Sequence, residues 1–166
     1  FLLLVLGGRV LGPGFGFALG RTTLFGSALI TAGVGPWMPY QMFACAWIGL
    51  FSGCLPQLRG KAEIAMLAAY GAVAGYAYGF LSNLSFWPFS LDPGSSIAYV
   101  PGASLATQWH HYLVFDATTS LGWDTGRAIT NFAAICIVGP AALRTFRRAA
   151  RKAAFTAPVE FSPAGA

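Results

Sequence analysis

Long apolar runs separated by short turns rich in glycine, proline or charge dominate the sequence. None of the runs alternates apolar and polar residues in the manner of a membrane barrel strand. The pattern therefore predicts an all-α protein. The positions of the runs and of the helix breakers between them give five hydrophobic segments: residues 1–12, 14–32, 39–55, 62–86 and 105–143.

The scarcity of charge indicates that these helices lie in a membrane. Of the 166 residues, 56% are hydrophobic and only 9% are charged, and the mean hydropathy is +0.62. Soluble domains carry about 25% charged residues, and a span needs roughly 20 apolar ones. We expect a polytopic helical membrane protein with about four full spans. Residues 1–12 are interpreted as the end of a truncated first span, so the transmembrane domain, 1–143, is N-terminally incomplete.

The cations predict the orientation of this domain. Arg59 and Lys61 lie in the turn PQLRGKAE, and five more Lys and Arg residues lie in RTFRRAARKAAF. By the positive-inside rule both stretches face the cytoplasm. The turn near Gly35 and the loop around Asp92 then face outward. We expect residues 144–166 to form a basic cytoplasmic C-terminal tail that contacts lipid headgroups and binds no nucleic acid.

Glycines recur every fourth residue in several of the apolar segments. Such rows form flat grooves in which another helix backbone can approach closely. We expect most of them to join helices of this chain, while a sliding contact with another membrane subunit is the alternative. The candidate helix-packing residues are Gly49, Gly53, Gly71, Gly75 and Gly79, and the same interval relates Gly8, Gly12, Gly16 and Gly20.

Aromatic residues and two amides gather at the predicted outer ends of the segments. Rings that stack, together with amides that donate and accept hydrogen bonds, suit a flat and mostly neutral organic ligand. An aromatic belt at the membrane interface is the alternative. The candidate substrate-binding residues are Trp37, Tyr40, Gln41, Asn83, Trp87 and Trp109.

The last segment carries most of the polar residues, in the stretch WHHYLVFDATTSLGWDTGRAITN. On a helix, one face would contain Asp116, Ser120, Trp123, Arg127 and Asn131. Ionisable groups at membrane depth usually face the bundle and pair, so we expect an intramembrane ion pair between Asp124 and Arg127. A proton relay from Asp116 to His110 or His111 is an alternative use of this face.

The sequence contains no motif for catalysis or for a metal. It lacks a phosphate-binding Gly-Lys-Ser/Thr loop, an HExxH, a CxxC and a serine nucleophile elbow. Cys45, Cys54 and Cys136 lie in apolar runs without metal-ligand spacing, and we expect buried, inert thiols. We therefore predict no enzyme, no cofactor and no metal site.

Several stretches together resemble the S components of energy-coupling factor (ECF) transporters, most of all those of high-GC Gram-positive bacteria. They are LGPGFGFALG, GVGPWMPYQMFACAWIGL, the span that ends in NLSFWPF, and SLGWDTGRAITN before a basic tail. The resemblance implies a bacterial plasma membrane protein with six spans when complete. It also implies that Trp37 and Gln41 line a ligand pocket. Against that six-span pattern we expect the chain to run from the end of the second span to the sixth. The first span of the family, which carries the docking surface in relatives, would then precede Phe1, so no docking residues are assigned.

The resemblance further implies a function. An S component captures a vitamin or related micronutrient from outside, then docks on a T component and two ATPase subunits of an ABC-type importer. The GPWMPYQM stretch favours a cobalamin-like ligand, with thiamine, its pyrimidine precursor and queuosine precursors as other candidates. Two alternatives stay open: an ion-coupled secondary transporter that uses Asp116, Asp124 and Arg127, and a structural membrane protein without a ligand.

Overall fold

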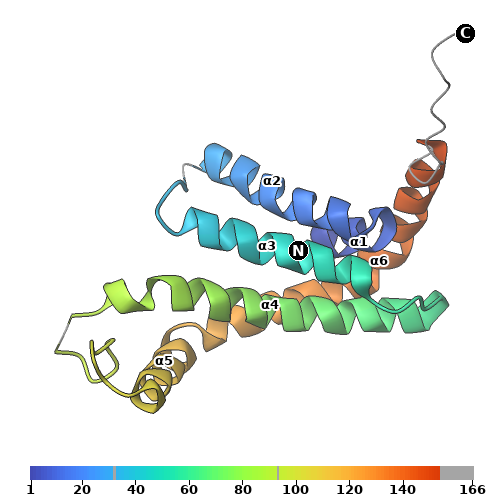
Figure 1. The fold of residues 1–166 in the computed structure, drawn as a ribbon. Helices are drawn as coiled ribbons and strands as arrows, with labels where there is room; N and C mark the ends of the chain where they lie inside the picture. Colours follow the sequence, from blue (N-terminus) through green and yellow to red (C-terminus); the bar gives the residue numbers. More distant parts are fainter. Residues whose placement is uncertain (32, 93, 154–166) are drawn as a thin grey trace, which may run out of the picture.

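The computed structural model describes residues 1–31, 33–92 and 94–153, and in this part of the chain every regular element is a helix. These residues form six helices, which are labelled along the chain in Figure 1. Their bounds are α1 Leu2–Leu11, α2 Pro13–Thr31, α3 Met38–Cys54, α4 Gly60–Ser90, α5 Leu105–Thr119 and α6 Leu121–Lys152. The all-α prediction is confirmed.

The first four helices correspond to the first four apolar segments, and the fifth segment is divided at Ser120. The Thr118 and Thr119 hydroxyls there donate to backbone carbonyls of the preceding turn, the first to Val114 and the second to Phe115. Such bonds compete with regular helix geometry. Ser120 adopts φ −125° and ψ −21°, and the chain changes direction between α5 and α6 (Figure 1).

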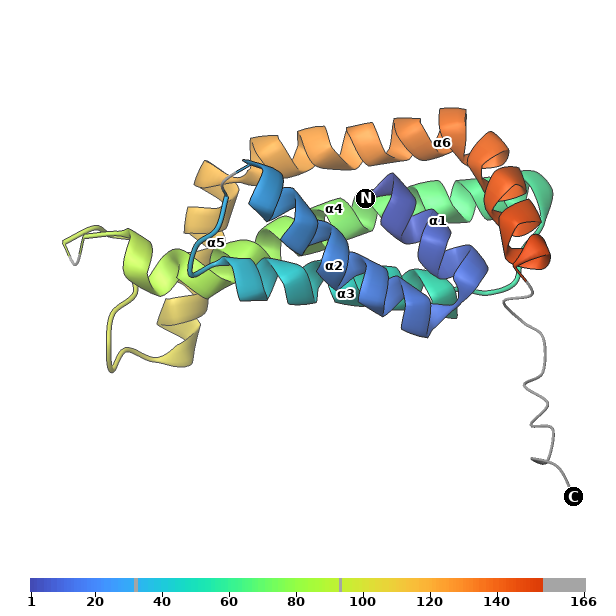
Figure 2. The same ribbon diagram turned by 90° about the horizontal axis from the view of Figure 1, so that it is seen from above.

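The helices form two closely packed pairs, α2 with α3 and α4 with α6, and α1 contacts both pairs (Figures 1 and 2). The α2–α3 turn and the loop after α4 lie at one end of the molecule. The α1–α2 turn, the α3–α4 turn and the C-terminal end of α6 lie at the other (Figure 1). The second end holds most of the cations, because Arg59, Lys61 and the basic part of α6 all belong to it.

The α2–α3 pair meets backbone to backbone. A Cβ built on Gly49 would lie 2.0 Å from the Gly16 carbonyl oxygen, and one built on Gly20 would lie 2.2 Å from that of Cys45. Gly53 is similarly close to Pro13 of α2. Gly12 differs from the other glycines of its row, because it has a φ of +93° and open space where a Cβ would be. It forms the turn between α1 and α2 and does not pack.

The α4–α6 pair uses the second row of glycines. Gly71 faces Ile135, Gly75 faces Ala128, and Gly79 faces the Asp124 carboxylate. Gly75 and Gly79 leave room for the Ala128 backbone and for a charged group on α6 directly against the α4 backbone. The predicted packing glycines of both rows therefore lie at contacts within this chain.

Within the described residues, α4 and α6 are long and apolar enough to cross a membrane, as judged by length and composition, and α1 is a shorter apolar helix. The basic residues from 144 to 152 continue α6, so the expected boundary after residue 143 falls inside a helix. Residues 154–166 of the expected tail lie outside the described part.

The expectation that all three cysteines are buried is wrong. Cys45 is buried, whereas Cys54 and Cys136 are exposed. An apolar run does not say which of its faces meets a neighbouring helix and which meets the surrounding solvent, so the burial of a single cysteine could not be predicted.

Candidate functional site

A cavity of about 390 Å³ lies between the last turns of α4, the first turns of α5 and the loop that joins them. It is at the end of the molecule opposite the basic end (Figure 1). Aromatic and aliphatic groups supply most of its wall. The lining residues are Leu84, Trp87, Tyr99, Gly102, Ala103, Leu105, Gln108, Trp109 and Tyr112.

The loop is fastened to both helices by side-chain hydrogen bonds. The Trp87 indole donates to the Ile97 carbonyl at 2.9 Å, and His111 Nδ1 lies 2.9 Å from the Ala98 carbonyl oxygen. Gln108 accepts from the Val100 amide and donates to its carbonyl. The wall that the loop gives to the cavity is therefore built into the fold.

Local sequence explains how the loop enters α5. Ser104 caps the helix, since its hydroxyl accepts from the Thr107 amide at 3.2 Å. Gly102 adopts a φ of +83°, which favours glycine because other residues are strained there. These residues direct the first turn of α5, with Gln108 and Trp109, towards the end of α4.

Four aromatic rings form a connected wall. The Trp87 ring centroid lies 5.4 Å from that of Tyr112 and 5.7 Å from that of Tyr99. The Trp109 and Tyr112 centroids are 5.9 Å apart. These spacings are typical of favourable aromatic pairs. Trp87 and Tyr112 are buried, so the partly exposed rings of Tyr99 and Trp109 are the ones that offer stacking surface to a flat molecule.

Three polar side chains of the cavity, those of Trp87, Gln108 and Tyr112, already form hydrogen bonds within the protein. The Tyr112 hydroxyl donates to the Phe80 carbonyl, and burial raises the pKa of its phenol, so this hydroxyl stays a neutral donor. None of the lining residues is a carboxylate, a lysine, a cysteine or a histidine. The cavity is suited to binding by shape and stacking and has no groups for acid–base or nucleophilic chemistry.

Of the six candidate substrate-binding residues, Trp87 and Trp109 line this cavity. Trp37, Tyr40 and Gln41 lie at the α2–α3 turn and the start of α3. That turn is at the same end of the molecule (Figure 1), but within the described residues α3 makes no contact with α5. The outer aromatic residues therefore form two separate groups. The order of spans and turns predicts the end of the bundle at which a residue lies, but it does not predict how far apart the helix pairs are at that end.

Asn83 points into a helix junction and not into the cavity. Its amide donates to Asp116 Oδ1 at 2.7 Å and to the Ser120 hydroxyl at 2.5 Å. Asn83 thereby ties α4 to the end of α5 and the start of α6. Asn83 binds Asp116, and His111 contacts the loop. Among the described residues no hydrogen bond joins Asp116 to His110 or His111, so these groups do not form a hydrogen-bonded proton relay.

Further polar contacts continue along the α4–α6 interface. Asp124 forms an ion pair with Arg127, whose guanidinium also lies over the Tyr78 ring and donates to the Gly75 carbonyl at 3.3 Å. Asn131 donates to the Gly71 carbonyl at 3.4 Å. Trp123 is the exception to the predicted polar face: it is 79% exposed, because Asp124, four residues after Ser120, occupies the position facing α4.

Sequence reasoning missed a second ion cluster at the basic end. Glu63 Oε1 accepts from Arg9 Nε at 2.9 Å and from Arg147 at 2.6 Å, and Arg9 also donates to the Leu55 carbonyl. Arg9 and Glu63 are buried, whereas Arg147 is about half exposed. Glu63 lies near the start of an apolar segment, and an acidic residue in such a place is expected to pair with a cation. This was the one signal in the sequence for the ion cluster. Arg9 and Arg147 are far from Glu63 in the sequence, so they could not be identified as its partners.

Comparison with known proteins identified no relative. No protein-family model, no curated protein and no solved structure matches the chain. Within the described residues no group of three or more His, Cys, Asp or Glu side chains could hold a metal ion.

Proposed function

We propose that this chain is the substrate-binding membrane subunit of an importer, of the S component type, and that its ligand binds in the aromatic cavity between α4 and α5. The observation that carries the proposal is this cavity, with four rings in its wall and its position opposite the basic end. The T component and the two ATPase subunits belong to the proposal through the sequence resemblance alone.

A multi-pass arrangement fits the helix lengths. Besides α4 and α6, α2 has 19 residues and α3 has 17, and spans have about 17–25 residues. With four spans, the basic end faces the cytoplasm and the cavity opens on the outer side. A ligand that arrives from outside would meet the aromatic wall first.

The cavity size narrows the proposed ligand. Small-molecule sites in proteins have volumes of about 300–1,000 Å³, and 390 Å³ is near the lower limit. This volume favours a micronutrient with one or two aromatic rings, such as thiamine or its pyrimidine precursor, over a cobalamin-like ligand. Because the polar residues along α4 and α6 bind one another, they favour a structural role for that interface over ion coupling.

The orientation is tested by cysteine labelling in intact cells. In a variant whose native cysteines are replaced by alanine, we expect Val34→Cys and Gly94→Cys to react with a membrane-impermeant maleimide. Leu58→Cys should react only after the cells are opened, since its turn carries Arg59 and Lys61. The opposite labelling pattern would exclude the proposed topology, and labelling of all three from outside would exclude a membrane between the two ends.

The site is tested by Trp109→Ala. Trp109 is 45% exposed, so its removal should leave the fold intact. Loss of one stacking contact, worth about 0.5–1.5 kcal/mol, should raise the dissociation constant roughly twofold to tenfold. The ligand is first identified by mass spectrometry of small molecules that co-purify with the protein, and affinity is then measured by calorimetry.

Trp123→Ala is the matched control for this experiment, because Trp123 is exposed on α6 and lies outside the cavity. Its affinity should equal that of the unmodified protein. If Trp109→Ala binds normally and Trp37→Ala binds weakly, the ligand site is at the α2–α3 turn and the proposed cavity is wrong.

A further inference from the structure

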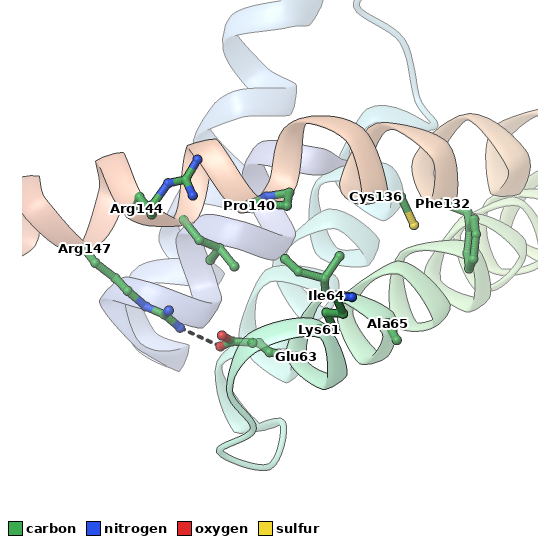
Figure 3. A pocket seen from close by; sticks show the side chains of 11 residues that line it. Lys61, Glu63, Ile64, Ala65, Phe132, Cys136, Pro140, Arg144 and Arg147 are labelled. Atoms are coloured by element: carbon green, nitrogen blue, oxygen red, sulfur yellow. Dashed lines mark hydrogen bonds and ion pairs between the residues drawn. The ribbon is translucent and has the colours of Figure 1, made fainter.

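A second cavity, of about 590 Å³, lies between the first turns of α4 and the part of α6 from Phe132 to Arg147 (Figure 3). Its floor is apolar, and three cationic side chains also belong to its lining. The floor includes Ile64, Phe132, Cys136, Pro140 and Leu143, and the positive charge comes from Lys61, Arg144 and Arg147. We call this cavity the inner groove.

Pro140 accounts for the shape of the inner groove. It lies inside α6 and has no amide hydrogen for the carbonyl of Cys136, so the helix is weakened at this turn. Figure 2 shows α6 changing direction towards its C-terminal end. The basic last turns thus leave the line of α4, while Phe132 and Cys136 before the proline remain beside it.

The charges of the inner groove are not balanced within the described residues. Glu63 is its one carboxylate, and this group already binds Arg9 and Arg147, the second pair being drawn in Figure 3. Lys61 and Arg144 are exposed and form no ion pair with any described residue. Two uncompensated cations therefore stand beside an open apolar surface, to which the exposed side chain of Phe132 belongs.

We propose that the inner groove binds an anionic phospholipid. Its phosphate would lie between Lys61 and Arg144, and an acyl chain would follow Phe132 and Cys136 along α6. Basic pockets between spans on the cytoplasmic side suit such headgroups. A free phosphate would bind the two cations but would leave the apolar floor unoccupied. The presence of cations beside an apolar floor therefore favours a lipid over a free phosphate. The inference uses the membrane placement of the proposed function and is independent of the ligand cavity.

The test uses the purified protein in nanodiscs of phosphatidylcholine containing a minor share of phosphatidylglycerol. Lipids that stay bound after extraction into detergent are counted by native mass spectrometry. Lys61→Gln with Arg144→Gln should reduce the preference for phosphatidylglycerol roughly tenfold or more, since each cation near the lipid surface contributes. Arg151→Gln with Lys152→Gln removes the same charge outside the groove and should leave the preference nearly unchanged.

A second pair of variants tests the apolar floor with all charges in place. Cys136→Phe fills the groove and should displace phosphatidylglycerol, whereas Val138→Phe adds a similar bulk to a residue that does not line it and should have little effect. Inorganic phosphate should not compete with the lipid. Competition by phosphate, combined with normal lipid binding in Cys136→Phe, would overturn the proposal in favour of a simple anion site.

Two other outcomes separate this inference from the proposed function. Equal loss of lipid preference in both charge variants would mean that the whole basic end attracts lipid without a site, and would overturn the inference alone. Failure of the unmodified protein to enter nanodiscs would overturn the membrane placement as well. A negative result for Trp109→Ala in ligand binding would leave the lipid result standing.

Discussion

Gly49→Ala is expected to destabilise the protein strongly, because the added methyl group would lie 2.0 Å from the Gly16 carbonyl oxygen and 2.6 Å from its carbonyl carbon. Both are backbone atoms, which cannot move aside like the end of a side chain, so α2 and α3 must separate. Overpacking of this kind costs about 3 kcal/mol. The thermal unfolding midpoint in detergent should fall by roughly 6–12 °C.

Gly26→Ala is the matched control on α2, since no other group lies within 4 Å of the position of its new methyl group. Alanine is the better helix former by up to about 1 kcal/mol, so this variant should be as stable as the unmodified protein or slightly more stable. A Gly49→Ala protein that melts together with Gly26→Ala would show that α2 and α3 do not meet through Gly16 and Gly49.

Glu63→Gln should have a comparable effect at the basic end. The substitution keeps the size of the side chain but leaves the buried Arg9 without a counter-charge. Removing one partner of a buried ion pair typically costs about 3–5 kcal/mol. The free energy of unfolding, measured by denaturant titration in detergent, should fall by this amount.

Two further variants identify the cause of that loss. Arg147→Gln removes the partner that is 45% exposed, and such pairs contribute about 0–1 kcal/mol, so a small effect is expected. Arg9→Met combined with Glu63→Met removes both buried charges and should recover much of the stability. If the double variant is less stable than Glu63→Gln, the cluster stabilises the fold through its hydrogen bonds, including that to Leu55, and not through charge compensation.

The helices could be predicted from the sequence because their determinants are local. Apolar runs and breakers placed α1 to α4 with small errors at the ends, and intervals of four identified the glycines at both helix interfaces. The break at Ser120 was missed since its cause is a competition of Thr118 and Thr119 hydroxyls with the helix. The stretch on both sides of Ser120 contains no proline, so nothing in its pattern marked the break.

The cavity was only half predictable. Trp87 and Trp109 were found because aromatic residues at segment ends attract attention wherever they occur. Gln108 and Tyr112 were missed, and Tyr99 was not assigned to the site, since their place in the cavity depends on how loop residues 94–104 fold back over α4 and α5. Trp37, Tyr40 and Gln41 were grouped with Trp87 and Trp109 because all five were predicted at the same end of the bundle. The predicted topology gives that end, but it does not give the neighbours of a residue there.

The contact of α2 with α3 through glycine has a thermodynamic consequence. A side chain that is immobilised at an interface loses up to about 2 kcal/mol of rotamer entropy, whereas glycine has no rotamers to lose. Several large side chains of this pair are exposed, among them Leu29, Ile30 and Phe43. The two helices therefore associate without loss of rotamer entropy in these side chains. The side chains remain free to change rotamer and to pack against the surrounding lipid or protein.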